Sequence, residues 1–145
     1  MTKVFVICMA FLYLMLPGIS AAGNLTDNLN GTVTDSGTLL IWQQGENSAV
    51  TWEAALTYCE GLSLAGQPYW RLPNHKELLS LVDYTRYSPS INTTFFPNAF
   101  SSYYWSSTTM VYGTTTAWNV AFDGGYSSGN AKTVSSYVRC VRGGQ

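Results

Sequence analysis

The order of short, clearly bounded segments constrains the fold of this chain more than any other feature of its sequence. Two β-rich runs, residues 31–34 and 38–43, flank Asp35-Ser36-Gly37. This pattern predicts a hairpin in which Gly37 takes a positive φ. Two segments with helical signals follow, then an irregular connection, and then several β-rich segments. The order predicts a single α+β domain, with two helices packed on short antiparallel strands.

The first helix is expected between Thr51, which can cap its start, and Gly61, which can end it. Its apolar positions share the i, i+3, i+4, i+7 spacing of one buried face. These positions are Trp52, Ala55, Leu56 and Cys59.

The second helix is expected directly after Pro73. Asn74 is a capping residue, and Glu77 three positions later completes a capping-box pattern. Its buried stripe consists of Leu78, Leu81 and Val82. Residues 84–99 contain two prolines and predict an irregular connection.

The pattern changes to strands toward the C-terminus. Trp118, Val120 and Phe122 alternate with smaller or polar residues, which predicts a strand with one buried face. Asp123-Gly124-Gly125 predicts a turn. Residues 137–142 predict one final strand, with the following residues on one face: Val138, Cys140 and Arg142.

The N-terminus has the layout of a secretory signal peptide. Lys3 precedes the apolar run 4–16, and the small residues Ser20-Ala21-Ala22 follow. We therefore expect residues 1–22 to be removed and residues 23–145 to form one exported domain, located in the periplasm, at the cell surface or outside the cell. An uncleaved membrane anchor is the alternative, but a membrane span needs about 20 apolar residues.

Composition and charge exclude several classes of protein. The chain is 46% hydrophobic and 14% aromatic, which is ample material for a core and argues against disorder. Its net charge is −1, and loss of Lys3 with the signal peptide makes the mature chain more acidic. A nucleic-acid binder needs a basic surface, so we expect no nucleic-acid partner, and contact with a membrane only during export.

Two cysteines, Cys59 and Cys140, remain after the signal peptide. An even number of cysteines in an exported chain permits a disulfide. Two separate buried thiols are the competing interpretation.

Catalytic and metal-binding signals are weak. His75 is the only histidine, and no cysteine lies near it to complete a zinc ligand set. The chain has no strand-turn-helix nucleophile motif and no glycine-rich phosphate loop. We therefore expect a protein that is not an enzyme and has no cofactor.

Residues 101–137 carry the strongest binding signal. About two thirds of them are Ser, Thr, Tyr, Gly or Asn, a bias shared with antibody binding loops. Polar strand faces and turns of exported proteins can also have this composition. The expected ligand surface consists of Tyr103, Tyr112, Thr114, Thr115, Asn119, Asp123, Tyr126, Ser127 and Asn130.

One motif resembles a known family. Trp70-Arg71-Leu72-Pro73-Asn74, followed by Glu77-Leu78, resembles the W-R-L-P-x-x-x-E-L signature of an exported bacterial domain family. That family is named after the C-terminal domain of the collagen-like adhesin Lcl. Further resembling segments occur in the same order along the chain, at residues 30–35, 40–42, 51–54, 104–108, 117–118 and 137–142.

The resemblance implies a C-type-lectin-like fold, with the N-terminal hairpin close to the C-terminal strand. In that fold a disulfide often joins the first helix to the final strand, which would pair Cys59 with Cys140. It also implies a scaffold role for the motif: an aromatic and a leucine pack inward, an arginine binds loop carbonyls and a proline starts the helix. The residues concerned are Trp70, Arg71, Leu72, Pro73 and Glu77.

Many lectins with the fold implied by this resemblance bind sugars through a calcium ion. Sugar-binding C-type lectins use a Trp-Asn-Asp sequence at their cation, whereas this chain has Trp118-Asn119-Val120 and lacks the acidic ligand. We therefore expect no metal site. The Lcl adhesin is associated with sulfated polysaccharides, but this acidic chain does not offer the charge that a polyanion needs.

The resulting hypothesis is an exported adhesion or ligand-binding domain that recognises a glycan or a protein without calcium. Three alternatives stay open. One is a receptor domain of the same fold that is diversified by a retroelement, and another is a self-associating structural module of the envelope. The third is an enzyme on a formylglycine-generating-like scaffold, which would need reactive cysteines. The family's adhesin suggests a trimer as a possible oligomer.

Overall fold

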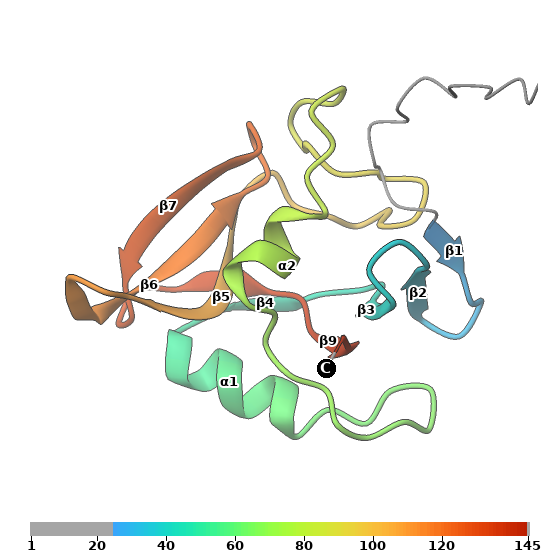
Figure 1. Cartoon of the computed structure of the whole chain (residues 1–145), viewed down its shortest axis with the longest axis horizontal. Coiled ribbons are helices and arrows are strands. Elements are labelled where there is room, and N and C mark those ends of the chain that lie inside the picture. The colour runs from blue at the N-terminus through green and yellow to red at the C-terminus, as the bar shows by residue number, and fades with distance from the viewer. Residues whose placement is uncertain (1–24, 145) are drawn as a thin grey trace, which may run out of the picture.

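The computed structural model describes residues 25–144 and shows a mixed α+β domain with two helices and two β-sheets (Figure 1). The expected signal peptide, residues 1–22, lies outside the described residues. The helices are α1 (Trp52–Glu60) and α2 (His75–Leu79). The strands are β1 (Leu25–Asp27), β2 (Thr32–Asp35), β3 (Leu40–Gln43), β4 (Asn47–Val50), β5 (Tyr103–Met110), β6 (Gly113–Ala121), β7 (Tyr126–Ala131), β8 (Ser136–Val138) and β9 (Val141–Gly143).

The first sheet has the strand order β1-β2-β3-β9, and all its neighbours are antiparallel. Ile41 of β3 pairs with Arg142 of β9. The N-terminal hairpin and the C-terminal strand are therefore adjacent, as expected.

The second sheet has the order β4-β8-β5-β6-β7. Its pairs are antiparallel except for β5 and β8, which run parallel and meet at Tyr104 and Tyr137. The strands β5, β6 and β7 follow one another as hairpins, and β7 lies at the edge of the sheet (Figure 1).

The prediction of one final strand over residues 137–142 is wrong. The segment is divided between the two sheets, with β8 in the second and β9 in the first. Arg139 lies at the crossing, where its buried guanidinium donates a hydrogen bond of 2.8 Å to the carbonyl of Gln43 and others to the next two carbonyls. These bonds hold residue 139 at the point where the chain passes from β8 to β9.

The predicted limits of α1 are confirmed, and so is the capping box of α2. Asn74 accepts a hydrogen bond from the Glu77 backbone N–H at 2.9 Å, and the Glu77 carboxylate accepts one from the Asn74 N–H at 2.8 Å. Thr51 is the N-cap of α1, but its side chain makes no capping hydrogen bond. The Trp52 N–H instead donates to the Lys132 carbonyl at 3.0 Å, which fixes the start of α1 to the end of β7.

The first hairpin forms as predicted, but its positive φ falls on Leu39 (60°) and not on Gly37. The Asp35 carboxylate accepts hydrogen bonds from the Gly37 N–H at 2.9 Å and from the Thr38 hydroxyl at 2.7 Å. This side-chain turn holds the first part of a loop over residues 36–39, and the positive φ comes at its end, two residues later than expected.

The two helices cover opposite faces of the second sheet. Tyr104 packs in one core cluster with Leu78 of α2, whereas the next residue, Trp105, packs in the other cluster with Ala55 of α1. Both faces of β6 are therefore buried near its C-terminal end. The prediction that only the Trp118 face is buried is wrong, because Ala117, Asn119 and Ala121 on the other face are fully buried as well.

A disulfide joins Cys59 of α1 to Cys140 between β8 and β9, with the two Cα atoms 5.5 Å apart. The interpretation of two separate thiols is therefore wrong. The bridge spans 81 positions of the chain, and loop-closure entropy assigns it a stabilisation of about 4–5 kcal/mol. No helix within residues 25–144 is long and apolar enough to cross a membrane.

Candidate ligand-binding surface

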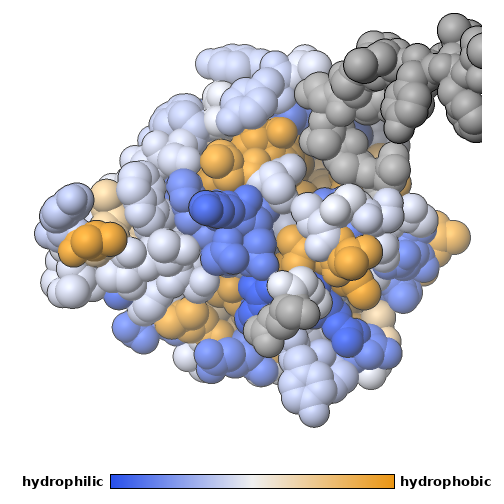
Figure 2. All heavy atoms as spheres, viewed as in Figure 1, coloured by the Kyte–Doolittle hydropathy of each residue, from blue (hydrophilic) through white to orange (hydrophobic). Residues whose placement is uncertain are grey.

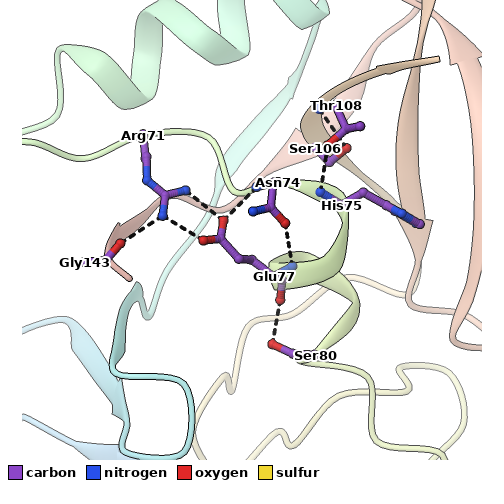
Figure 3. A network of polar contacts seen from close by, with 8 residues as sticks. All are labelled: Arg71, Asn74, His75, Glu77, Ser80, Ser106, Thr108 and Gly143. Carbon is purple, nitrogen blue, oxygen red and sulfur yellow. Dashed lines mark hydrogen bonds and ion pairs between the residues drawn. The ribbon is translucent and has the colours of Figure 1, made fainter. Parts of the chain in front are cut away.

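The Trp70–Glu77 motif forms a clamp between α2 and β9. Arg71 binds Glu77 with two parallel contacts of 2.7 and 2.8 Å, and it also donates to the Gly143 carbonyl at 2.9 Å (Figure 3). Burial opposes ionisation of Glu77, but the hydrogen bonds from Arg71 and from the Asn74 backbone outweigh it and lower the pKa of Glu77. The polar groups of this motif are thus engaged within the chain.

The remaining motif residues lie in the interior. Trp70 and Leu72 are each 2% exposed and pack in the cluster that includes α1, while Pro73 is buried directly before the α2 cap. Figure 2 shows strongly hydrophilic residues gathered in a band over α2 and toward β9, where the clamp lies. This placement gives the motif a scaffold position.

Six of the nine sequence-predicted ligand residues lie at one or the other end of β6. Tyr103, Asp123 and Tyr126 lie at its C-terminal end, where Ala121 pairs with both tyrosines. The other end carries Tyr112, Thr114 and Thr115, while Asn130 of β7 pairs with Ala117 in the middle of β6. A nine-residue strand spans roughly 25–30 Å. One compact ligand therefore cannot contact both ends.

The C-terminal end of β6 brings two tyrosines and a carboxylate together. The Tyr103 and Tyr126 hydroxyls are 3.1 Å apart, and their rings meet edge to face with centroids 6.3 Å apart. The Asp123 carboxylate accepts from the Gly124 N–H at 2.8 Å and from the Tyr126 hydroxyl at 3.4 Å. These contacts orient the two rings at the surface.

Two further tyrosines from the 84–99 connection join this cluster. A Cβ placed on Gly124 would lie 3.3 Å from the Tyr126 ring and 3.9 Å from the Tyr87 ring. A Cβ on Gly125 would lie 3.4 Å from the Tyr84 ring. Both glycines thus lie among tyrosine rings, and we call these four residues the tyrosine patch: Tyr84, Tyr87, Tyr103 and Tyr126.

The sequence analysis missed Tyr84 and Tyr87 because their segment has no periodic pattern. Their side chains are 74% and 81% exposed, which is high for aromatic rings. The segment is held to the β6–β7 turn by the Ser88 N–H, which donates to the Asp123 carbonyl at 3.0 Å. The one available signal was the presence of two tyrosines in a predicted loop.

The electrostatics of the patch keep the Tyr126 hydroxyl protonated. The hydrogen bond to Tyr103, together with desolvation and the nearby Asp123 charge, raises the pKa of Tyr126 to about 12. The Tyr126 hydroxyl therefore stays a neutral donor and acceptor at physiological pH. The patch can offer ring faces, hydroxyls and one carboxylate to a ligand.

The other end of β6 forms an open groove of about 610 Å³ against the start of α1. Lys132 lies over the Trp52 ring, with its ammonium 3.8 Å from the ring centre. Tyr112 is fully exposed at the adjoining β5–β6 turn. The groove is lined by Thr51, Glu53, Thr114, Thr115, Lys132 and Thr133.

Two predicted ligand residues lie elsewhere. Asn119 is 0% exposed, so its assignment to an exposed surface is wrong; it points to the sheet face that α1 covers. The Ser127 hydroxyl is 2.7 Å from Nε2 of His75, whose ring stacks on Trp118 with centroids 5.0 Å apart. Burial lowers the pKa of His75. Within residues 25–144 no carboxylate forms a hydrogen bond with this histidine.

The described part of the chain contains no group of three or more His, Cys, Asp or Glu side chains arranged to hold a metal ion. Residues 31–142 match the protein family described as the Lcl C-terminal domain, and this match covers more than half of the chain. No match to this chain was found among curated proteins.

Proposed function

The chain belongs to the family of Lcl C-terminal domains, and we propose that it is an exported binding domain that recognises its ligand, a glycan or a protein, through the tyrosine patch without calcium. The observation that carries this proposal is the convergence of four tyrosines from separate segments around Gly124 and Gly125. Two of these rings are more than 70% exposed.

The chemistry of the patch favours a glycan with uncharged sugars. A sugar ring presents apolar C–H faces, which pack on aromatic rings, and hydroxyls, which bind carboxylates and phenols. Asp123 places a carboxylate beside the Tyr126 ring. A polyanionic glycan would meet this carboxylate without a compensating cation in the contacts that define the patch.

Two observations support the wider proposal. The Cys59–Cys140 disulfide is typical of an exported protein, and it leaves neither of these thiols free for chemistry of the formylglycine-generating kind. The same bridge, together with the pairing of β3 with β9, supports a C-type-lectin-like fold.

The proposal is tested by glycan-array screening of the purified protein, followed by calorimetric titration of the strongest binder. We expect Tyr87→Ala and Tyr126→Ala to weaken binding by about tenfold each, since one aromatic contact contributes about 1–1.5 kcal/mol. Tyr69→Ala is the matched control, because Tyr69 is 85% exposed but lies beside Arg71 and Gly143, away from the patch.

Tyr112→Ala separates the two ends of β6 and is expected to leave binding unchanged. Chelation of divalent cations should also have no effect on the dissociation constant. Equal losses from Tyr69→Ala and Tyr87→Ala, or loss of binding on chelation, would contradict the proposal. If the protein binds only protein ligands, and Tyr87→Ala weakens that binding, the tyrosine patch is the binding site but its ligand is a protein and not a glycan.

A further inference from the structure

The outer edge of β7 is unpaired. β7 is the last strand of the second sheet, and all six of its residues pair with β6 on one side only. Figure 1 shows β7 at the margin of the sheet, with no other strand or helix beyond it. An edge of this kind presents backbone N–H and C=O groups that can pair with another strand.

The other sheet edges are protected in ways that β7 is not. β1 is only three residues long and includes Asp27, and β4 has an irregular register between Asn47 and Val50. β9 is also three residues long, and the backbone of Arg71 already pairs with its Val141. Short length, charge and irregular register all hinder the addition of a strand. β7 has six residues in continuous register and the sequence Tyr-Ser-Ser-Gly-Asn-Ala, with no charge and no proline.

The alternation of the β6–β7 ladder identifies the free groups. The Lys132 N–H donates to the Thr115 carbonyl at 2.9 Å, so every second residue before Lys132 also directs its backbone groups toward β6. Ser127, Gly129 and Ala131 therefore direct theirs outward. Among the described residues, the one turn bond to these groups runs from the Val134 N–H to the Ala131 carbonyl, at 3.0 Å.

An apolar side chain lies over the middle residue of β7. A Cβ on Gly129 would lie 2.3 Å from the Met110 sulfur, so the Met110 side chain lies directly over this glycine. An incoming strand would find free backbone groups at Gly129 and an apolar side chain beside them.

We propose that β7 pairs in antiparallel fashion with β7 of a second copy of this chain, with the two-fold axis at Gly129. In this register Ser127 faces Ala131 of the second copy, and the two Gly129 residues face each other. Each of these outward-facing pairs can exchange two backbone hydrogen bonds.

The side chains on the α1-facing side match in the same register. Ser128 faces Asn130 of the second copy, which pairs a hydroxyl with an amide. Tyr126 faces Lys132 of the second copy, so that an aromatic ring lies beside the alkyl stem of a lysine whose ammonium is over Trp52. No like charges meet, because β7 is uncharged and Lys132 faces a tyrosine in this register. This self-complementarity favours a second copy over an unrelated strand, and the dimer does not depend on the proposed ligand.

Sedimentation equilibrium of the purified protein tests the proposal, together with hydrogen–deuterium exchange at rising protein concentration. We expect a dimer, and slower exchange of the Ser127, Gly129 and Ala131 amides as the dimer forms. A monomer at all concentrations up to several hundred micromolar would overturn the proposal. A dimer in which these amides exchange at an unchanged rate would overturn it as well.

Two variants define the interface. Ala131→Pro removes an outward N–H that has no partner in the single chain, and an edge strand tolerates proline at such a position. Ser128→Lys places a charge on each copy beside the paired strands. We expect each variant to raise the dimer dissociation constant by at least about tenfold.

Thr26→Lys is the matched control, because it adds the same charge to an exposed position of the β1 edge and should leave the dimer intact. Thermal unfolding of the monomer at the wild-type temperature shows that a variant is folded. If Ala131→Pro does not fold, Ser128→Lys alone tests the interface. Dimerisation of Ser128→Lys at wild-type concentration would overturn the proposed pairing. If the β7 amides are protected only after another protein is added, the strand that pairs with β7 belongs to that protein and the proposed self-pairing is wrong.

Discussion

The clamp at α2 and the tyrosine patch use polar side chains in opposite ways. At the clamp, Arg71 and Glu77 have relative side-chain exposures of 28% and 14%, and their charged groups bind each other and the backbone. In the patch, Tyr84 and Tyr87 are mostly exposed, and the hydroxyls of Tyr103 and Tyr126 bind each other at the surface. Groups whose partners lie within the chain stabilise the fold, whereas exposed groups stay available to a ligand.

Arg139 extends this comparison into the interior. It is 0% exposed, donates to three consecutive backbone carbonyls, and lies 3.3 Å from the Glu46 carboxylate. Its guanidinium also lies over the Phe96 ring, 4.4 Å from the ring centre. Tyr104 donates a hydrogen bond to Glu46 as well. The polar groups of this cluster are buried and bind one another, whereas those of the tyrosine patch are exposed to solvent.

The largest expected effect comes from Arg139→Leu. The substitution removes the cation beside the buried Glu46 carboxylate and the donor to three carbonyls, so we expect a loss of about 3–5 kcal/mol in the free energy of unfolding. Urea denaturation measures it. Arg142→Leu is the control, because Arg142 makes one exposed hydrogen bond, to Gln67, and should change stability by less than about 0.5 kcal/mol. Similar losses of stability in the two variants would contradict the claim that the buried arginine contributes more than the exposed one.

The next effect is a dependence of stability on pH. Burial raises the pKa of Glu46 to about 7, against the opposing charge of Arg139. The unfolded chain has the lower pKa, so the folded state binds the proton more tightly. This contribution is complete below about pH 4.5 and is lost as the pH rises through 7, which amounts to at most about 3 kcal/mol.

Denaturation of the wild type at pH 5 and pH 8 measures this slope, and Glu46→Gln is its control. The amide does not titrate, so the part of the slope that comes from this site should disappear in the variant. An equal slope in both proteins would assign the pH dependence to another group.

A smaller effect is expected at the clamp. Arg71→Lys keeps the charge but loses the two-contact geometry with Glu77 and the bond to the Gly143 carbonyl, so we expect a loss of about 1–2 kcal/mol. Arg86→Lys at the more exposed Asp83 pair should cost less than about 0.5 kcal/mol. Neither variant should alter ligand affinity at the tyrosine patch. A change in ligand affinity with Arg71→Lys would show that the clamp contributes to binding, and would contradict its purely structural role.

Local elements were predictable because their signals lie within a few residues. The helical face that includes Trp52 and Cys59 repeats every turn, and the Asn74–Glu77 box is complete within four positions. Asp35 shows the limit of such reasoning. Its carboxylate holds the Gly37 N–H and displaces the positive φ to Leu39, an outcome set by one side-chain hydrogen bond.

The candidate site was predictable only in part. Tyr103, Asp123 and Tyr126 were named from the composition of their segment, and the structure places them in contact with one another. Asn119 is buried because α1 covers its face of the sheet, and no pattern within residues 113–121 reports the position of that helix. Tyr84 and Tyr87 reach the patch through a connection whose path depends on contacts with the β6–β7 turn.

The sequence by itself determined the mixed α+β class, the limits of α1, the capping box and the membership in the Lcl C-terminal domain family. Each of these follows from residue spacing along the chain. The tertiary structure alone decided that residues 136–143 divide between two sheets, that Arg139 is buried and that four tyrosines share one surface. These features depend on contacts between residues far apart in the chain, and local propensity carries no information about such contacts.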